Sequence, residues 1–198
     1  VRSRLLPRGA EHWLGTDESG RDIFTRLIYA GRVSLTVGIG VAIISSFVGS
    51  IMGLVSGFFK RLDGPISRLV DAMMAFPDIL LAISLVAVLG GTVTNVIIAL
   101  SIVYTPRIAR IVRASTLVIR ELPYVEASKA LGIGTPTILF SHILRNIMSP
   151  IIVQATFIFA HSMLSEASLS FLGVGVNPST PTWGTMISNG RQYIDVAT

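Results

Sequence analysis

Residues 33–59 read VSLTVGIGVAIISSFVGSIMGLVSGFF, a run of 27 residues without a charged side chain. A helix needs about 20 apolar residues to cross the roughly 30 Å hydrocarbon core of a bilayer, so this run predicts a membrane-spanning helix. Small residues recur in it at four-residue intervals and therefore share one helical face. Such a face lets a second helix approach closely where lipid supplies no hydrophobic force, so we expect it to pack against another helix. Its members are Ser45, Gly49, Gly53 and Gly57.

The composition of the whole chain agrees with a membrane protein. Hydrophobic residues make up 51% of the 198 residues, and the mean hydropathy is +0.70. Only 14% are charged, against about 25% in an ordinary soluble domain. The net charge of +5 is dispersed between apolar runs, a pattern that reports membrane orientation better than nucleic-acid binding. Cysteine is absent, which excludes disulfides, thiolate metal sites and cysteine nucleophiles.

A second uncharged stretch covers residues 79–106. Gly90-Gly91 near its middle is a turn signal, which favours two helices at 70–89 and 93–112 over a single one. Two helices also place the basic flanks of residues 60–68 and 107–113 on the same side of the membrane, as the positive-inside rule requires. Charged residues at the inner ends, Asp71, Arg107 and Arg110, are then expected near the membrane surface. Residues 146–165 form the fourth predicted span.

These spans define three regions of the chain. We expect residues 1–32 to be an external segment and 176–198 a second external segment after the fourth span. Residues 33–175 form the predicted transmembrane domain, with a cytoplasmic segment at about 113–145. One observation conflicts with this orientation, because residues 1–32 also carry six Lys or Arg residues.

The sequence lacks the motifs that mark several classes of ATP-binding protein and enzyme. No G-x-x-x-x-G-K-[ST] phosphate loop is present, so ATP binding by this chain is not expected. The three histidines are too scattered to suggest a zinc site, and no serine lies in a G-x-S-x-G elbow. The sequence therefore predicts neither a cofactor, a metal site nor an enzyme.

Residues 120–146 predict two short helices separated by glycine. Pro123 suits a first helical position, and Gly132 can end that helix in a left-handed conformation. Thr135 is expected to cap a second helix. A face of the first helix carries small residues beside one aromatic ring: Tyr124, Ala127, Ala130 and Leu131. This face could seat in the groove of a partner or pack under the chain's own bundle, and the pattern alone does not decide between them.

The same segment resembles the "EAA" signature of permeases in binding-protein-dependent ABC importers, through Glu126-Ala127-Ser128-x-x-x-Gly132 followed by Ile143. Four further motifs in order resemble the second permease subunit of dipeptide, oligopeptide and nickel importers. They are His12-Trp13-Leu14-Gly15-Thr16-Asp17 with Gly20-Arg21-Asp22, Phe76-Pro77, Glu166-Ala167-Ser168-Leu169-Ser170-Phe171-Leu172-Gly173, and Pro181-x-Trp183-Gly184.

The resemblance implies an all-α, polytopic permease bundle in the bacterial inner membrane, with one more span before residue 1 and one after residue 198. It implies a second permease subunit, two ATPase subunits that hold ATP and magnesium, and an external solute-binding protein, with no nucleic acid. Transport would follow alternating access. A peptide is the first choice of solute, nickel or another small solute the alternative, and a stand-alone secondary transporter the less favoured one. The expected ATPase-coupling residues are Tyr124, Glu126, Ala127, Ser128, Ala130, Leu131 and Gly132.

Two positions depart from the family pattern. Ser128 stands where a second alanine is usual, which is a mild change. Arg145 stands where proline is usual, so the second coupling helix is expected to run straighter into the fourth span. Polar residues in or near the spans are candidates for a solute pathway, although helix–helix hydrogen bonds, or an interfacial position in the case of Glu166, are the favoured explanation. They are Asn95, Gln154, His161 and Glu166.

Overall fold

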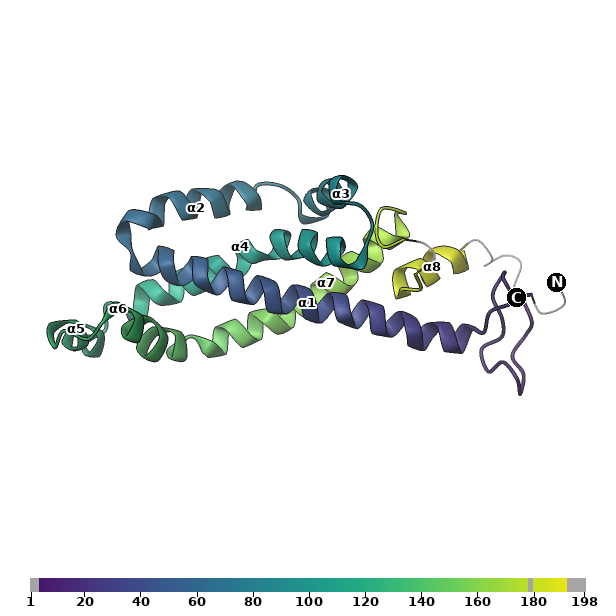
Figure 1. Ribbon diagram of the computed structural model, residues 1–198, viewed down its shortest axis with the longest axis horizontal. Coiled ribbons are helices and arrows are strands. Elements are labelled where there is room, and N and C mark those ends of the chain that lie inside the picture. Colours follow the sequence, from purple (N-terminus) through teal and green to yellow (C-terminus); the bar gives the residue numbers. More distant parts are fainter. Residues whose placement is uncertain (1–3, 178–179, 192–198) are drawn as a thin grey trace.

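The computed structural model describes residues 4–177 and 180–191, and helices dominate that part of the chain. The long helices run side by side, so the described part is elongated (Figure 1). The expected all-α membrane fold is confirmed. The elements are α1 (Ile23–Phe58), α2 (Lys60–Met74), α3 (Asp78–Leu89), α4 (Val93–Ile119), α5 (Pro123–Ala130), α6 (Thr135–Thr137), the π-helix η1 (Ile138–Leu144), α7 (Met148–Phe171) and α8 (Trp183–Arg191).

The small-residue face of α1 packs against α4. A Cβ atom at Gly53 would lie 2.5 Å from the Cβ of Val112 and 2.7 Å from the carbonyl oxygen of Ala109. Real Cβ atoms do not approach that closely, so only glycine permits this crossing. The neighbouring contacts are of the same kind: Gly49 against Ile108, and Gly57 against Thr116. Ser45 is fully buried on the same face, where its hydroxyl donates to the carbonyl oxygen of Val41 over 2.6 Å.

The prediction of one straight span over residues 70–89 is wrong. The chain forms α2 and α3 instead, which meet at an angle of 92° across residues 75–77. Pro77 has no backbone N–H to continue a helix, and its ring disfavours the helical conformation for Phe76. Phe76-Pro77 was the visible signal for this break.

The predicted break between residues 89 and 93 is confirmed. Gly90 has a φ of 91°, a conformation that ends α3 and that side chains on other residues rarely tolerate. The side chain of Thr92 then accepts a hydrogen bond from the backbone N–H of Asn95 and caps α4. A Cβ at Gly91 would lie 2.4 Å from the carbonyl oxygen of Gly175, so this turn is packed against the segment that follows α7.

The helix ends differ from the predicted ones. α1 begins at Ile23, so the expected external segment 1–32 includes its first ten residues. The cause is Asp22, whose Oδ2 accepts from the backbone N–H of Thr25 over 2.7 Å and caps the helix. α7 covers 148–171 and not 146–165. α8 was not predicted, and it falls within the expected external segment 176–198, of which residues 178–179 and 192–198 lie outside the described part.

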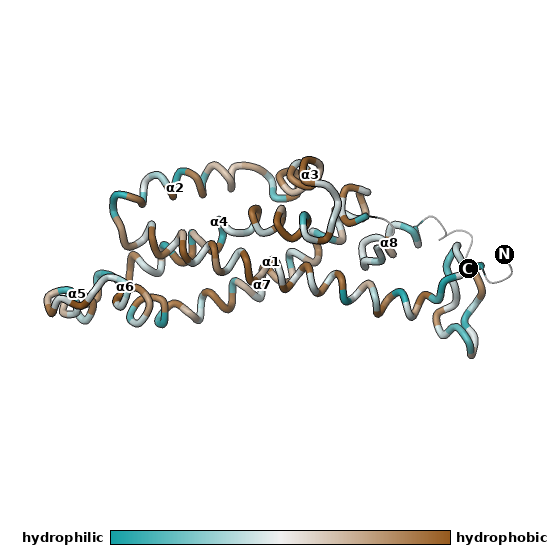
Figure 2. The backbone as a smooth tube through the Cα atoms, viewed as in Figure 1, coloured by the Kyte–Doolittle hydropathy of each residue, from teal (hydrophilic) through white to brown (hydrophobic). Residues whose placement is uncertain are grey.

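Within residues 4–177 and 180–191, three helices are long and apolar enough to cross a membrane: α1, α4 and α7. Hydrophobic residues follow them along most of their length, whereas the loop before α1 is more hydrophilic (Figure 2). The bent pair of α2 and α3 would supply a fourth crossing. The predicted count of four spans therefore depends on this pair.

Cysteine labelling tests the arrangement of α2 and α4. Asp63 of α2 pairs with Arg113 of α4, with 2.9 Å between Oδ2 and Nη2, which brings the residues near them toward the same end of the bundle. We expect Ser67→Cys and Ser115→Cys to react with an impermeant thiol reagent from the same, cytoplasmic side of the membrane. Reaction from opposite sides would contradict the paired arrangement.

Candidate functional site

The segment with the "EAA" pattern lies at one end of the bundle, away from α8 and the start of α1 (Figure 1). Pro123 is at the N-terminus of α5. Gly132 has a φ of 74°, and its backbone N–H donates to the carbonyl oxygen of Lys129 over 3.0 Å. The backbone N–H of Ile133 donates to the carbonyl oxygen of Ser128 over 3.1 Å. Two carbonyl groups at the end of α5 therefore have hydrogen-bond partners. The predicted helix, glycine break and helix are present.

The two faces of α5 differ in exposure. Val125 and Ser128 are buried against the bundle. The predicted docking face points outward, and the side chain of Leu131 is 81% exposed. Most of the face therefore does not pack under the chain's own bundle, although the hydroxyl of Tyr124 accepts from the side-chain amide of Asn146 over 3.2 Å. Ser128 must be removed from the docking set, because its hydroxyl is turned inward and donates to the carbonyl oxygen of Tyr124 over 2.7 Å. The exposed members are Tyr124, Glu126, Ala127, Ala130, Leu131 and Gly132.

The predicted cap of the second short helix is shifted by one residue. Gly134 is the cap, with an extended backbone, and Thr135 is the first helical residue. Arg145 has helical dihedral angles, φ −58° and ψ −36°, so the helical course continues through it. The interruption comes at Ile147, with φ −103° and ψ 8°. Without proline at 145, the η1 backbone thus runs on for two more residues before α7 begins.

The four candidate pathway residues do not form one site. The side-chain amide of Asn95 donates to the carbonyl oxygen of Leu89, so it ties α4 to the end of α3. The ring of His161 packs against that of Phe157, with 4.5 Å between centroids. Gln154 and His161 are seven residues apart and share a face of α7, and both are partly exposed.

Glu166 is fully buried where α1, α7 and α8 meet. Its Oε1 accepts from the hydroxyl of Ser170 over 2.7 Å, and its Oε2 accepts from that of Ser34 over 3.2 Å. The first backbone N–H of α8, at Trp183, lies 3.4 Å from the same Ser34 oxygen. The partners of Glu166 are therefore two serine hydroxyls. This buried group links three helices.

Close contacts reinforce the docking of α8. A Cβ at Gly184 would lie 2.6 Å from the Cα of Ala167, so α8 and α7 meet at backbone distance. The indole Nε1 of Trp183 donates to the carbonyl oxygen of Leu27 over 3.2 Å. A Cβ at Gly31 would lie 3.2 Å from the same indole ring. α8 is thus fixed to both α1 and α7.

The sequence did not predict a set of ion pairs between α4 and the bent pair of helices α2 and α3 (the α2–α3 elbow). The residues expected near the membrane surface, Asp71, Arg107 and Arg110, are each paired across helices: Arg107 with Asp78, and Arg110 with Asp71. Arg113 and Asp63 form the third pair. The visible signal was the arginine at every third position of one helix, which places all three within reach of one neighbour.

The loop before α1 forms a compact structure around Asp17. Its carboxylate accepts from the backbone N–H groups of Ser19 and Arg21, over 2.9 and 2.8 Å, and pairs with the side chains of Arg21 and Arg26. Burial raises the pKa of Asp17, but these hydrogen bonds outweigh burial and hold the pKa below its usual value. Asp17 therefore stabilises the loop above the ordinary aspartate pKa, and this is lost as the pH falls through the lowered pKa.

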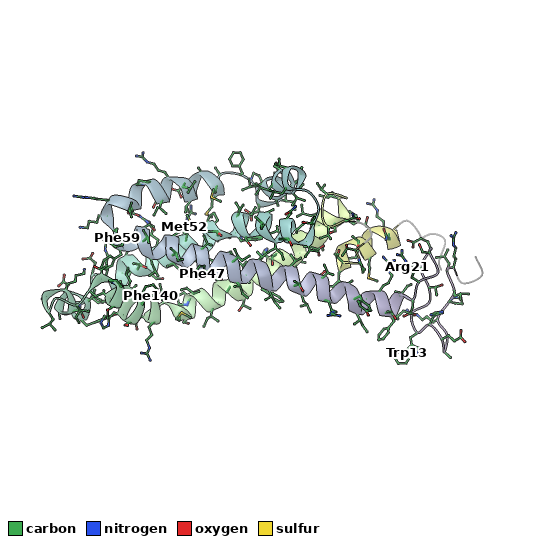
Figure 3. The ribbon with its side chains drawn as sticks, in the orientation of Figure 1. Trp13, Arg21, Phe47, Met52, Phe59 and Phe140 are labelled. Carbon is green, nitrogen blue, oxygen red and sulfur yellow. The ribbon has the colours of Figure 1, made fainter. Side chains whose placement is uncertain are left out.

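The side chains of both aspartates thus bind groups within the chain: Asp17 stabilises the loop, and Asp22 caps α1. The side chain of Trp13, by contrast, is 68% exposed, and its indole lies against the ring of Phe24 with 5.4 Å between centroids. Figure 3 shows Trp13 and Arg21 at the end of the bundle opposite Phe140. Across residues 4–177 and 180–191, no group of three or more His, Cys, Asp or Glu side chains is arranged to hold a metal ion.

Comparison with known proteins adds to this geometry. The family described as "binding-protein-dependent transport system inner membrane component" matches residues 45–197. The chain is 48% identical over 193 residues to a putative peptide transport system permease protein of Brucella suis, covering 98% of this chain and 65% of the relative. It is 46% identical over 196 residues to a dipeptide transport system permease protein of Alkalihalophilus pseudofirmus, covering 98% of this chain and 64% of the relative.

A glutathione transport system permease protein of Pectobacterium atrosepticum is 41% identical over 187 residues, which cover 94% of this chain and 62% of that protein. The chain thus spans about two thirds of the length of these curated relatives or slightly less.

Proposed function

The chain belongs to the family of inner-membrane components of binding-protein-dependent transport systems, and from this premise we propose that it is a permease subunit of an ATP-driven peptide importer. In this proposal it spans the bacterial inner membrane several times and pairs with a second permease subunit. An external binding protein delivers the solute, and two ATPase subunits bind ATP and magnesium. The permease itself catalyses no reaction and holds no cofactor.

The observation that carries the proposal is the outward face of α5. Small side chains at its centre leave room for a partner, and Leu131 presents an apolar side chain that is 81% exposed in the described part of the chain. An exposed face of this kind on a short helix suits a groove in a partner protein. Movement of that partner would be transmitted through α5 and η1 to α4 and α7, which gives an alternating-access switch the mechanical link that it needs.

Peptide is the proposed solute because the relatives are described as permeases for peptides, dipeptides and glutathione. The direct test uses the full-length permease in its complete complex, reconstituted into vesicles with the binding protein. We expect ATP-dependent uptake of a labelled dipeptide and no uptake of labelled nickel. Nickel uptake without dipeptide uptake would replace peptide with a metal solute.

Two substitutions of Gly132 test the coupling role. No neighbouring atom lies within 4 Å of a Cβ at this position, so a new side chain meets backbone strain alone. At a φ of 74°, the β-branched side chain of Gly132→Val should cost about 1–3 kcal/mol and change the angle after α5. Uptake and binding-protein-stimulated ATP hydrolysis should both fall sharply.

Gly132→Asn is the matched control, because asparagine tolerates the left-handed conformation. It should retain most of the transport activity. Equal, normal transport in both variants would show that this segment does not transmit movement.

Glu126 on the same face distinguishes docking from local helix stabilisation. If Glu126 pairs with a basic group of the ATPase, Glu126→Ala should weaken association of the subunits by about 2–5 kcal/mol. If Glu126 serves only the helix dipole, the loss should be about 0.3–1 kcal/mol. Retention of the ATPase during purification measures the difference.

A further inference from the structure

Three ion pairs connect α4 to the α2–α3 elbow: Arg107 with Asp78, Arg110 with Asp71, and Arg113 with Asp63. We refer to these six residues as the ion-pair ladder. α2 lies beside α1 and α4 (Figure 1). Of the residues in α2, only Val70 is buried, so apolar packing contributes little to holding this helix in place. The ladder is therefore the main polar connection between the elbow and the bundle.

The ladder extends to the middle of a membrane-spanning helix. Arg107 follows the start of α4 by 14 residues and precedes its end by 12, which is about 21 and 18 Å at 1.5 Å per residue. By length and composition α4 is a candidate membrane span, and charged side chains within such a span are found facing a bundle interior or a water-filled cavity and seldom face lipid. The position of Arg107 therefore argues that this face of α4 is not exposed to hydrocarbon.

The ladder is also incompletely covered by the chain. The side chains of Arg110 and Asp71 are 51% and 66% exposed, although they are paired with each other over 2.6 Å. A guanidinium group has five N–H donors, and a pair of this kind uses only some of them. The remaining donors require water or another polar partner, because hydrocarbon offers no acceptor.

The space beside the ladder supports a wet surface. A cavity of about 60 Å³ lies between α1, α2 and α4 and is lined by Ser67, Asp71 and Arg110, among others. The outward face of α1 is different, since Ile43 and Phe47 are 63% and 68% exposed and entirely apolar. Phe47 is marked in Figure 3. The chain thus presents an apolar surface suited to lipid and a separate charged surface suited to water.

We infer that the ion-pair ladder lines the water-filled path of the permease and offers successive charged sites to a zwitterionic solute. A solute carboxylate would replace an aspartate as the partner of a ladder arginine. A solute ammonium group would replace an arginine as the partner of a ladder aspartate. Partly exposed ion pairs suit this exchange because water and solute reach both partners. The inference rests on the proposed transport of peptides, whose two ends carry these charges.

Thiol accessibility tests the inference in the full-length permease, assembled in its complete complex in vesicles without other reactive cysteines. The variants are Asp71→Cys and Arg110→Cys, with Ser67→Cys as a small substitution that removes the 3.1 Å hydrogen bond from the Ser67 hydroxyl to Asp63 and no member of the three ion pairs. Phe47→Cys is the lipid-facing control. Methanethiosulfonate reagents react with the thiolate, which forms only in water, so the reaction rate reports contact with the aqueous path.

We expect positions 67, 71 and 110 to react at least tenfold faster than position 47. Asp71→Cys leaves Arg110 unpaired and should prefer the anionic sulfonate reagent, whereas Arg110→Cys leaves Asp71 unpaired and should prefer the cationic ammonium reagent. Dialanine should slow the reaction at positions 71 and 110.

Rates at 67, 71 and 110 no faster than at 47 would overturn the water-lined path. Fast reaction that dialanine does not slow would overturn the solute sites. Uptake of labelled dialanine by the unsubstituted complex is measured in parallel. If the unsubstituted complex takes up dialanine but the cysteines do not react, only the role of the ladder is refuted. If there is no uptake, the proposed function is refuted.

Discussion

Gly53→Leu should prevent the permease from assembling. The substitution places a Cβ atom 2.5 Å from the Cβ of Val112 and 2.7 Å from the backbone oxygen of Ala109. Neither of these atoms is the flexible end of a side chain, so α1 and α4 must move apart along their shared face. Overpacking of a core typically costs about 1–3 kcal/mol, and the loss here should lie at the upper end because two backbones meet. The yield of the folded complex and its thermal stability measure the effect.

Gly64→Leu is the matched control for size and residue type. Gly64 is also a helical glycine, but no atom lies within 4 Å of a Cβ built at that position. Its replacement should leave assembly unchanged or improve it slightly, because glycine is a poor residue inside a helix. If Gly53→Leu and Gly64→Leu assemble equally well, the close crossing of α1 and α4 is absent in the membrane.

Glu166→Leu should release α8 from the bundle. The substitution removes the acceptor of two buried hydroxyl groups, those of Ser34 and Ser170, and disturbs the position of Ser34 beneath the N-terminus of α8. Each buried polar group left without a partner costs about 1–3 kcal/mol. The complex should lose thermal stability, and the backbone amides of residues 183–191 should exchange hydrogen for deuterium faster.

Glu166→Gln is the control that keeps the shape and one acceptor oxygen. It should lose less stability than Glu166→Leu and should keep residues 183–191 protected. Unchanged amide exchange in Glu166→Leu would mean that the contacts of Trp183 and Gly184 hold α8 without help from the carboxyl group.

Part of the fold followed from local chemistry. Proline and glycine determine backbone conformation at their own positions, and for this reason Pro123, Gly132 and Gly90 correctly marked where helices begin and end. The same property made Phe76-Pro77 a visible break, although hydropathy alone favoured a continuous span. Helical periodicity also grouped Tyr124, Ala127, Ala130 and Leu131 on one face of α5, but it did not show that this face is exposed or that Ser128 lies on the buried side.

Pairing between distant residues did not follow from the sequence. Ser34 and Glu166 are separated by 132 positions, and Arg113 and Asp63 by 50. The sequence placed Asp71, Arg107 and Arg110 beside apolar runs but did not show which residues pair with them. Asn95 was considered for a solute pathway or for a hydrogen bond between helices, and its side-chain amide donates to the carbonyl oxygen of Leu89 at the end of α3.

The sequence by itself determined that this chain is a membrane protein with a small-residue helix face, a segment of two short helices joined at a glycine and the motifs of an importer permease. Only the tertiary structure decided that α4 is the partner of that face, that α2 and α3 bend by 92°, and that Ser128 faces inward. The physical reason is the range of the interactions. Hydropathy and backbone preferences act within a few residues, whereas the identity of a packing or charge partner depends on how the helices are arranged in space.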